Sequence, residues 1–297
     1  MVIPPPSPIK TMSSKPLNWF ITGTSSGFGL AMTTMLLARG DTVFATLRKP
    51  QRLEDLRRDY PETLHTAMLD VTNTADVRRV VDDAFRLLGR LDVIVNNAGY
   101  GLFGAAEELT DEQIRRQIDT NLIGSIQVIR AVLPHLRAQG SGRVLQVSSE
   151  GGQTAYPAFS LYHASKWGIE GFIESVSQEV AGFGIEFTIA EPGAALTNFG
   201  AGLDHPEPMV VYEASRVGEI RRAVMSRSLE GFGAIGDPEK MVRAMIDSVD
   251  IRPAPKRLAL GSGAYAHIRD ALSGRMAQLE VHKTVTMSTD ISVDQAH

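Results

Sequence analysis

The segment that most constrains the fold is a glycine-rich turn between an apolar strand and an apolar helix. Residues 17–22 read Leu-Asn-Trp-Phe-Ile-Thr and predict a strand, and residues 30–38 predict a helix that ends at Gly40. Gly23, Gly27 and Gly29 lie between them. This order is the context of a dinucleotide site, because glycines let the backbone approach a pyrophosphate that the helix N-terminus stabilises.

A second pattern provides acid–base chemistry. Tyr162 and Lys166 are four residues apart and would share one face of a helix. A lysine ammonium roughly 4 Å from a phenol is worth ~4 kcal/mol at an effective dielectric of about 20. That energy equals about three pKa units, which would draw the tyrosine pKa toward neutrality. Ser149 ends a strand predicted over residues 142–149, thirteen residues before Tyr162.

Together these motifs resemble the short-chain dehydrogenase/reductase family over about residues 17–262. That family carries Thr-Gly-x-x-x-Gly-x-Gly in its nucleotide turn and a serine thirteen residues before Tyr-x-x-x-Lys, as this chain does. The resemblance implies that Tyr162 is the general acid/base and that Ser149 hydrogen-bonds the developing alkoxide. It also implies that Lys166 tunes Tyr162 and binds the nicotinamide ribose, while Asn121 holds a relay water.

Three polar residues near these motifs have structural alternatives. A buried asparagine needs hydrogen-bond partners in any case, so a structural role for Asn121 stays open. Glu150, next to Ser149, is expected to be solvated. His163, next to Tyr162, is expected to be structural or exposed.

The end of the second strand is expected to decide the cofactor. Residues 42–48 predict a strand that ends at Arg48, with no acidic residue there. An acid at this place binds the ribose 2′-hydroxyl of NAD, whereas an arginine accommodates the 2′-phosphate of NADP. Arg48, helped by the Ser25 hydroxyl, therefore predicts NADP over NAD. The alternative is that Arg48 is only a solvated charge.

The resemblance also implies the other cofactor contacts. Asp70 and Val71 would contact the adenine, although Asp70 could also cap the helix expected from about residue 74. Residues 96–99, Asn-Asn-Ala-Gly, would stabilise the sheet beside the cofactor, and Pro-Gly-x-x-x-Thr at 192–197 would hold the carboxamide. The predicted cofactor-binding residues are Gly23, Ser25, Ser26, Gly27, Phe28, Gly29, Arg48, Asp70, Val71, Asn97, Ala98, Gly99, Tyr162, Lys166, Pro192, Gly193, Ala195 and Thr197.

The predicted fold is one Rossmann-type, doubly wound α/β domain with a mainly parallel seven-stranded sheet and helices on both faces. It is expected to span residues 16–297, after a disordered proline-rich extension over 1–15. The family carries its substrate lid at about 198–236. One long helix is expected over 110–138, and in the family it pairs across subunits with the helix expected at 161–181, which implies a homodimer or homotetramer.

Composition excludes several other classes. The 297 residues carry a net charge of −4 and no basic tract, so nucleic-acid binding is not expected. The absence of cysteine removes disulfides, Cys-ligated metal and thiol catalysis, and no metal is expected. The chain has no apolar run that could span a membrane and no apolar signal-peptide core at its start, so we expect a cytoplasmic protein.

The expected substrate is a small hydrophobic ketone or secondary alcohol. Tyr100, Phe103, Tyr156, Phe159 and Phe199 lie where pocket walls are expected, and such walls favour apolar ligands. The Ala-Thr-Leu-Arg run that ends the second strand resembles the 17β-hydroxysteroid and retinol dehydrogenase branch. Two other functions stay open: an NADP-binding redox sensor without turnover, and an acyl-carrier-linked ketoreductase.

Overall fold

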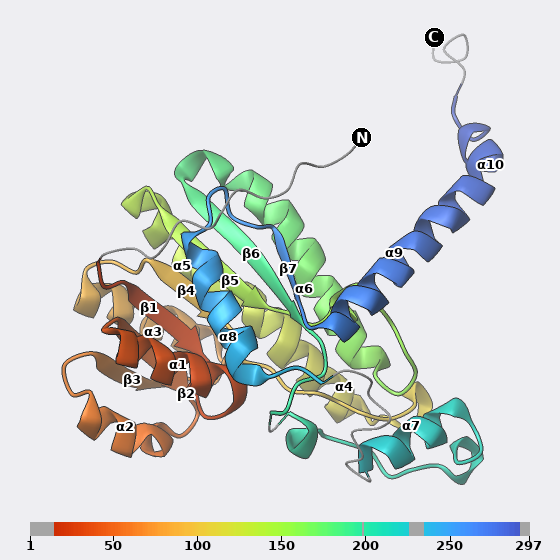
Figure 1. Cartoon of the computed structure of the whole chain (residues 1–297), viewed down its shortest axis with the longest axis horizontal. Coiled ribbons are helices and arrows are strands. Elements are labelled where there is room, and N and C mark those ends of the chain that lie inside the picture. The colour runs from red at the N-terminus through yellow and green to blue at the C-terminus, as the bar shows by residue number, and fades with distance from the viewer. Residues whose placement is uncertain (1–14, 198, 226–234, 292–297) are drawn as a thin grey trace.

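The computed structural model describes residues 15–197, 199–225 and 235–291, and within them a seven-stranded parallel sheet forms the centre of the molecule (Figure 1). The strands are β1 Asn18–Thr22, β2 Thr42–Leu47, β3 Leu64–Met68, β4 Val93–Asn96, β5 Gly142–Val147, β6 Ile185–Pro192 and β7 Arg257–Leu260. Their order is β3-β2-β1-β4-β5-β6-β7, so the sheet grows in opposite directions from β1 and β4. The predicted doubly wound fold is therefore confirmed.

The helices cover both faces of this sheet. They are α1 Gly27–Arg39, α2 Glu54–Asp59, α3 Thr74–Leu88, α4 Asp111–Ile118, α5 Ser125–Gln139, α6 Ser160–Glu179, α7 Arg216–Met225, α8 Pro238–Asp247, α9 Ser262–Val281 and α10 Lys283–Met287. Successive strand side chains point to opposite faces. Trp19 and Ile21 thus pack with α1 and α8, whereas Phe20 packs with α3, α5 and α6.

The long helix predicted over residues 110–138 is present but not regular. Asp119–Gly124 form a π-helical turn between α4 and α5. Within this turn the Asn121 side chain bonds the backbone of Tyr100, outside the helix, at 2.8 and 3.1 Å. The prediction of one uniform helix was wrong at this turn, because apolar spacing does not reveal a side chain anchored elsewhere. Such single π turns are frequent at functional sites.

The alternative role of Asp70, as the cap of α3, was also wrong. Asn73, directly before the helix, accepts a hydrogen bond from the backbone N–H of Asp76 at 3.1 Å. Asp70 lies too far before the helix to cap it. Its carboxylate instead accepts from the backbone N–H and the hydroxyl of Thr72, at 3.0 and 2.8 Å. This places Asp70 in a tight turn at the end of β3.

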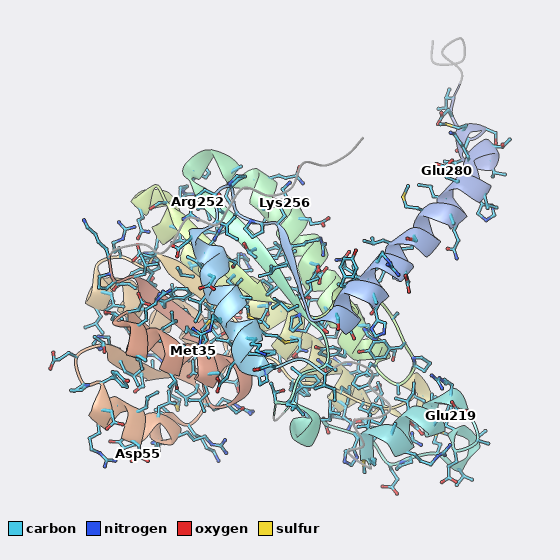
Figure 2. The ribbon with its side chains drawn as sticks, in the orientation of Figure 1. Met35, Asp55, Glu219, Arg252, Lys256 and Glu280 are labelled. Carbon is cyan, nitrogen blue, oxygen red and sulfur yellow. The ribbon has the colours of Figure 1, made fainter. Side chains whose placement is uncertain are left out.

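The C-terminal helices α9 and α10 project away from the sheet (Figure 1). Ala264 and Ile268 in the first turns of α9 are buried, whereas Met276 is 57% exposed. Figure 2 shows Glu280 far out on this helix and Glu219 on α7, at another extremity of the molecule. Residues 1–14 of the predicted extension lie outside the described part of the chain. None of the described helices is both long and apolar enough to cross a membrane.

Candidate active site

Three of the predicted catalytic groups meet at the carboxyl end of β5. Ser149 follows this strand, and its hydroxyl accepts a hydrogen bond from the backbone N–H of Gly151 at 3.1 Å. Tyr162 and Lys166 lie one turn apart on α6, whose start packs against the turn after Ser149. All three side chains belong to residues that are at most 8% exposed. The strand end therefore holds a hydroxyl, a phenol and an amine shielded from water.

The electrostatics of Tyr162 differ from the expectation based on spacing. Burial raises the pKa of Tyr162 to about 12; a hydrogen bond with Ser149 opposes this increase and the negative charge of Glu150 adds to it. The Lys166 ammonium lies 5.6 Å from the centre of the phenol ring. The predicted shift toward neutrality is therefore wrong for the protein alone, because the cost of desolvating a phenolate exceeds what an ammonium at this distance returns.

Lys166 is held away from the phenol by a backbone group. Its ammonium donates a hydrogen bond to the carbonyl of Val147, the last residue of β5, at 3.1 Å. Burial lowers the pKa of Lys166 to about 8, although the carboxylate of Glu170 opposes the decrease. Lys166 therefore sits close enough to neutral pH to exchange a proton.

The Asn121 side chain makes three hydrogen bonds to protein groups. Its amide nitrogen donates to the Tyr100 carbonyl at 2.8 Å and to the Ser165 hydroxyl at 3.4 Å, and its oxygen accepts from the Tyr100 N–H at 3.1 Å. The side chain thus ties the π-helical turn to the loop after β4 and to α6. This bonding favours the structural alternative for the amide itself.

The glycine turn after β1 is shaped to accept a pyrophosphate. Gly23 and Gly27 have φ of +73° and +56°, where a side chain is disfavoured. A Cβ at Gly23 would lie 2.8 Å from Ala98, and one at Gly29 would overlap the Gly23 carbonyl. Ser26 makes no side-chain cap, and the first turn of α1 holds no acidic residue. The N–H groups of Gly23 and Thr24 donate to the Thr46 carbonyl, so the groups left available to an anion are those at the start of α1, as a dinucleotide requires.

Two side chains at the carboxyl end of β2 and in the glycine turn suit a phosphate. Arg48 directly follows β2 and is exposed, together with Lys49. Arg48 makes no hydrogen bond or ion pair with any residue that the structure describes. Ser25 lies in the neighbouring glycine turn and is half-buried. The interpretation of Arg48 as a merely solvated charge stays compatible with this geometry.

The Asn-Asn-Ala-Gly segment joins β4 to the glycine turn. The amide nitrogen of Asn97 donates to the carbonyls of Thr22 and Gly23 at 2.9 and 3.0 Å. The Thr22 hydroxyl accepts from the backbone N–H groups of Asn97 and Ala98. Gly99 is exposed and faces Asn121. The expected stabilisation of the central sheet is thus visible in these bonds.

The other predicted cofactor residues lie at the ends of β3 and β6. Val71 packs in the core, so only its backbone is available to an adenine. Pro192 ends β6, and the N–H of Gly193 donates to the Leu260 carbonyl at 3.0 Å. The loop continues to Thr197, whose hydroxyl accepts from the N–H of Phe199 at 3.2 Å. Within this loop, Ala195 pairs with Gly236 in a short bridge.

Four of the five predicted pocket aromatics gather around Tyr162. The Phe159 ring centre lies 5.0 Å from that of Phe103 and 5.6 Å from that of Tyr156, and the Phe199 ring lies 5.5 Å from Tyr162. Tyr100 is the exception, because its ring lies 5.9 Å from the Arg116 guanidinium and its hydroxyl bonds the same group. Leucine, valine and isoleucine side chains from residues 203–224 pack against this cluster: Leu203, Val217, Ile220 and Val224.

The segment that supplies these aliphatic side chains is fastened over the site. Asp204 pairs with Leu102 in a backbone bridge, and Arg116 forms an ion pair with the Asp204 carboxylate. Further along, Arg221 on α7 donates to both oxygens of Glu108 at 2.5 and 2.6 Å. The Glu108 side chain is completely buried. We call Glu108 and Arg221 the lid pair.

Among three groups near the catalytic residues, the sequence misjudged Glu150, agreed with the structure for His163 and missed Arg257. Glu150 is 7% exposed, so its expected solvation was wrong; its carboxylate bonds His267 of α9 at 3.0 Å. His163 is buried and bonds the Gly151 carbonyl at 2.9 Å, consistent with its structural alternative. Arg257 of β7 contacts Glu170 on α6. No local pattern marks Arg257 or the lid pair, because the partners of each are distant in sequence.

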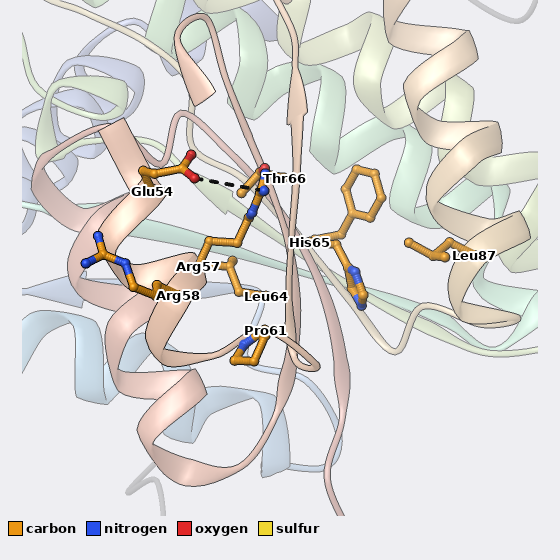
Figure 3. Close-up of a pocket in the computed structure, with 9 residues that line it drawn as sticks. Glu54, Arg57, Arg58, Pro61, Leu64, His65, Thr66 and Leu87 are labelled. Carbon is orange, nitrogen blue, oxygen red and sulfur yellow. Dashed lines mark ion pairs between the residues drawn. The ribbon is translucent and has the colours of Figure 1, made fainter. Parts of the chain in front are cut away.

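A separate cavity of about 550 Å³ lies at the outer edge of β3, distant from these groups (Figure 3). Arg57, Arg58, His65 and Thr66 are among its lining residues, and Arg57 approaches Glu54 at 4.0 Å. The cavity faces the sheet edge rather than the carboxyl ends of the central strands, where ligands of such sheets bind. No sequence motif points to it. Among the described residues no cluster suits a metal ion.

Fold and site together define a class: a Rossmann-type oxidoreductase that uses a nicotinamide cofactor. A match to the short chain dehydrogenase family covers residues 18–208, and the chain belongs to that family. The oxidoreductase BOA17 of Botryotinia fuckeliana is 35% identical over 91% of this chain and 98% of its own length. A 3-ketodihydrosphingosine reductase of Bacteroides thetaiotaomicron is 38% identical over 60% of this chain and 64% of its own length.

Solved structures agree with this assignment. A short-chain dehydrogenase from Streptomyces avermitilis is 38% identical and superimposes with a TM-score of 0.86, over 94% of this chain and 100% of that one. A variant of the actinorhodin polyketide ketoreductase, solved with NADPH, is 25% identical with a TM-score of 0.69, over 84% of this chain and 97% of that one.

Proposed function

We propose that this protein is an NADP-dependent reductase and dehydrogenase that interconverts a hydrophobic ketone and the corresponding secondary alcohol. The observation that carries the proposal is the buried convergence of Ser149, Tyr162 and Lys166 beside an apolar cluster. The bound nicotinamide supplies the hydride to the carbonyl carbon or accepts it.

In this proposal the protein's own residues manage the proton. Tyr162 donates its phenolic proton to the carbonyl oxygen during reduction, and takes it back during oxidation. The Ser149 hydroxyl stabilises the developing alkoxide. Burial lowers the pKa of Lys166 to about 8, so Lys166 can return a proton to the Tyr162 phenolate after reduction. Lys166 also binds the nicotinamide ribose. Asn121 would hold the relay water through its backbone in the π-helical turn or through the acceptor capacity left on its amide oxygen.

Cofactor discrimination is assigned to Arg48. Its guanidinium has no partner among the described residues, and Ser25 lies in the adjacent turn. A 2′-phosphate would satisfy both groups, whereas the 2′-hydroxyl of NAD would not neutralise the arginine. The remaining predicted contacts, from the glycine turn to Thr197, would hold the pyrophosphate, adenine and carboxamide.

The substrate class follows from the lid segment, which we assign to about residues 198–236; residues 198 and 226–234 of this assignment lie outside the described part of the chain. The described lid side chains that reach Tyr162 and its aromatic neighbours are aliphatic. A ligand placed there would exchange contacts with apolar groups and gain from their burial. The similarity to a 3-ketodihydrosphingosine reductase is consistent with a ketone attached to an apolar chain.

The testing experiment is a titration with NADPH and NADH followed by a screen of hydrophobic ketones. We expect NADPH to bind more tightly and to be oxidised only when a ketone is present. Arg48→Asp should shift the preference toward NADH, and an unchanged preference would remove Arg48 from the phosphate site. NADPH binding without turnover across a broad panel would instead favour the redox sensor. Turnover restricted to carrier-bound substrates would favour the ketoreductase.

Assembly as a homodimer or homotetramer is part of the proposal. The segments that pair in the family, α4–α5 and α6, carry the exposed apolar side chains Ile123 and Trp167, which are 41% and 42% exposed. Light scattering after size-exclusion chromatography tests it, and a monomer at micromolar concentration would contradict it.

A further inference from the structure

A buried polar network lies between α6 and the carboxyl-terminal half of the sheet, and the proposed mechanism does not use it. Its centre is the guanidinium of Arg257, at the start of β7. One nitrogen of this group contacts Glu170 of α6 and Glu191 of β6, and another contacts Glu174 at 2.6 Å. Glu170 and Glu191 are 2% and 1% exposed. Two fully buried carboxylates therefore share one cation.

The network reaches the loop that carries Ser149 at two points. The Ser148 hydroxyl donates to Glu170 at 2.5 Å. The amide nitrogen of Gln153 donates to Glu191 at 2.8 Å. The loop between them fits closely, because a Cβ added at Gly152 would overlap the Glu170 carboxylate. The position of this loop is thus coupled to both carboxylates.

The same carboxylates lie next to the two other segments of the proposed site, the helix with Tyr162 and Lys166 and the loop that begins at Pro192. Glu170 follows Lys166 by one helical turn on α6, and its charge helps to keep the lysine protonated. Glu191 directly precedes Pro192, where the loop proposed to hold the carboxamide begins. A single arginine therefore links three segments that are separate in sequence.

We propose that Arg257 is a positioning residue that aligns the Ser149 loop, the Tyr162–Lys166 helix and the Pro192 loop through Glu170 and Glu191. The inference rests on the proposed function, since it concerns the same site. Arg257 touches no reacting atom; it acts by neutralising the carboxylates that would otherwise repel one another.

Charge balance explains why the arginine is needed. The groups that face Glu191 are the carboxylate of Glu170, the amide of Gln153 and the cation of Arg257, which also pairs with Glu174. The ammonium of Lys166 is a second cation next to Glu170. Burial and the neighbouring Glu170 charge raise the pKa of Glu191 to about 7, although Arg257 and Gln153 oppose this. Without Arg257 the buried carboxylates would have to take up protons or separate.

The test compares Arg257→Met, Arg257→Lys and the double variant Arg257→Met with Glu191→Gln. The control is Arg86→Met, which removes an exposed ion pair with Asp83. We expect Arg257→Met to lower kcat about tenfold to a hundredfold with a smaller effect on KM, because small misplacements of catalytic groups have costs of this size. Arg257→Lys should recover part of the loss.

Two readouts separate alignment from general stabilisation. Activity of Arg257→Met should recover as pH falls through a midpoint above about 7, because protonation of Glu191 removes the excess charge and the loss of Arg257 takes away a group that lowers the Glu191 pKa. The added Glu191→Gln should give the same recovery at all pH values. Amide hydrogen exchange should rise in residues 148–153, 162–170 and 192–197 together.

The outcomes distinguish this inference from the proposed function. If the wild type reduces ketones and Arg257→Met matches Arg86→Met in kcat and pH profile, the inference fails alone. If the wild type shows no turnover, the proposed function fails, and hydrogen exchange still decides the inference. Exchange that rises uniformly over the chain, or in none of the three segments, overturns it.

Discussion

The lid pair offers a direct test of whether residues 199–225 form a lid over the proposed site. Replacing Arg221 with methionine keeps most of the side-chain volume and removes the charge. The buried carboxylate of Glu108 would then lose both of its bonds to the guanidinium, which are 2.5 and 2.6 Å long. We expect α7 to detach more often while the sheet stays folded.

The size of the effect follows from burial. Removing one partner of a buried ion pair costs about 3–5 kcal/mol. The Glu108 side chain is 0% exposed and that of Arg221 is 16% exposed, so the pair qualifies as buried. Glu108 keeps its hydrogen bonds from the N–H groups of Ala105 and Met209, at 2.7 and 2.9 Å. These bonds favour a cost at the lower end of that range. A cost of about 3 kcal/mol raises the opening equilibrium by roughly 150-fold.

Hydrogen exchange of the α7 amides measures this opening directly. The matched control on the same helix is Arg216→Met. The side chains of Arg216 and its partner Glu219 are 72% and 52% exposed, so their ion pair contributes about 0–1 kcal/mol. KM for the ketones found in the screen should rise in Arg221→Met and stay constant in the control. Equal exchange in the two variants would refute the reasoning, since burial would then have no energetic consequence.

The remaining predictions concern the proton chemistry and the pH response. Tyr162→Phe should keep the aromatic packing and NADPH affinity but lower turnover by about 10²- to 10⁴-fold in steady-state assays; comparable activity would sink the mechanism. Glu150→Gln removes a charge that raises the Tyr162 pKa, so the fall in reductase rate with increasing pH should occur at lower pH; an unmoved profile would contradict this. Burial acts to raise the pKa of Glu108, but bonds from Met209, Ala105 and Arg221 lower it overall. The lid pair therefore stabilises the attachment of the lid at pH values above about 4.3, the pKa of a glutamate in the unfolded chain, and this stabilisation is lost as pH falls below it. Limited proteolysis of the lid between pH 6 and 3 should detect the loss.

Local patterns were sufficient for the fold. Strand β1, the glycine turn and α1 are contiguous in sequence. Apolar runs and glycines therefore predict them without knowledge of the rest of the chain. The start of α8 also depends on adjacent residues only: Asp237, directly before Pro238, accepts from the N–H groups of Glu239 and Lys240. The parallel order of the strands then follows, because alternating strands and helices leave few other arrangements.

The proposed catalytic groups were also found from local spacing, but their electrostatics were not. A four-residue separation says that Tyr162 and Lys166 share a helix face; it does not say that the ammonium bonds the Val147 carbonyl instead. Nor does it report the burial that raises one pKa and lowers the other. Spacing identifies which residues are neighbours, whereas the direction of each pKa shift depends on the surrounding packing.

The residues that could not be predicted act through contacts distant in sequence. Glu108 and Arg221 are 113 residues apart, and Glu170 and Arg257 are 87 apart. A parallel sheet separates paired strands by whole helices, so the side chains that join them leave no periodic signal. Each such charge, seen alone, resembles an ordinary surface residue. Only burial distinguishes it, because a carboxylate removed from water must have a partner, and that requirement connects the lid and the site to the rest of the fold.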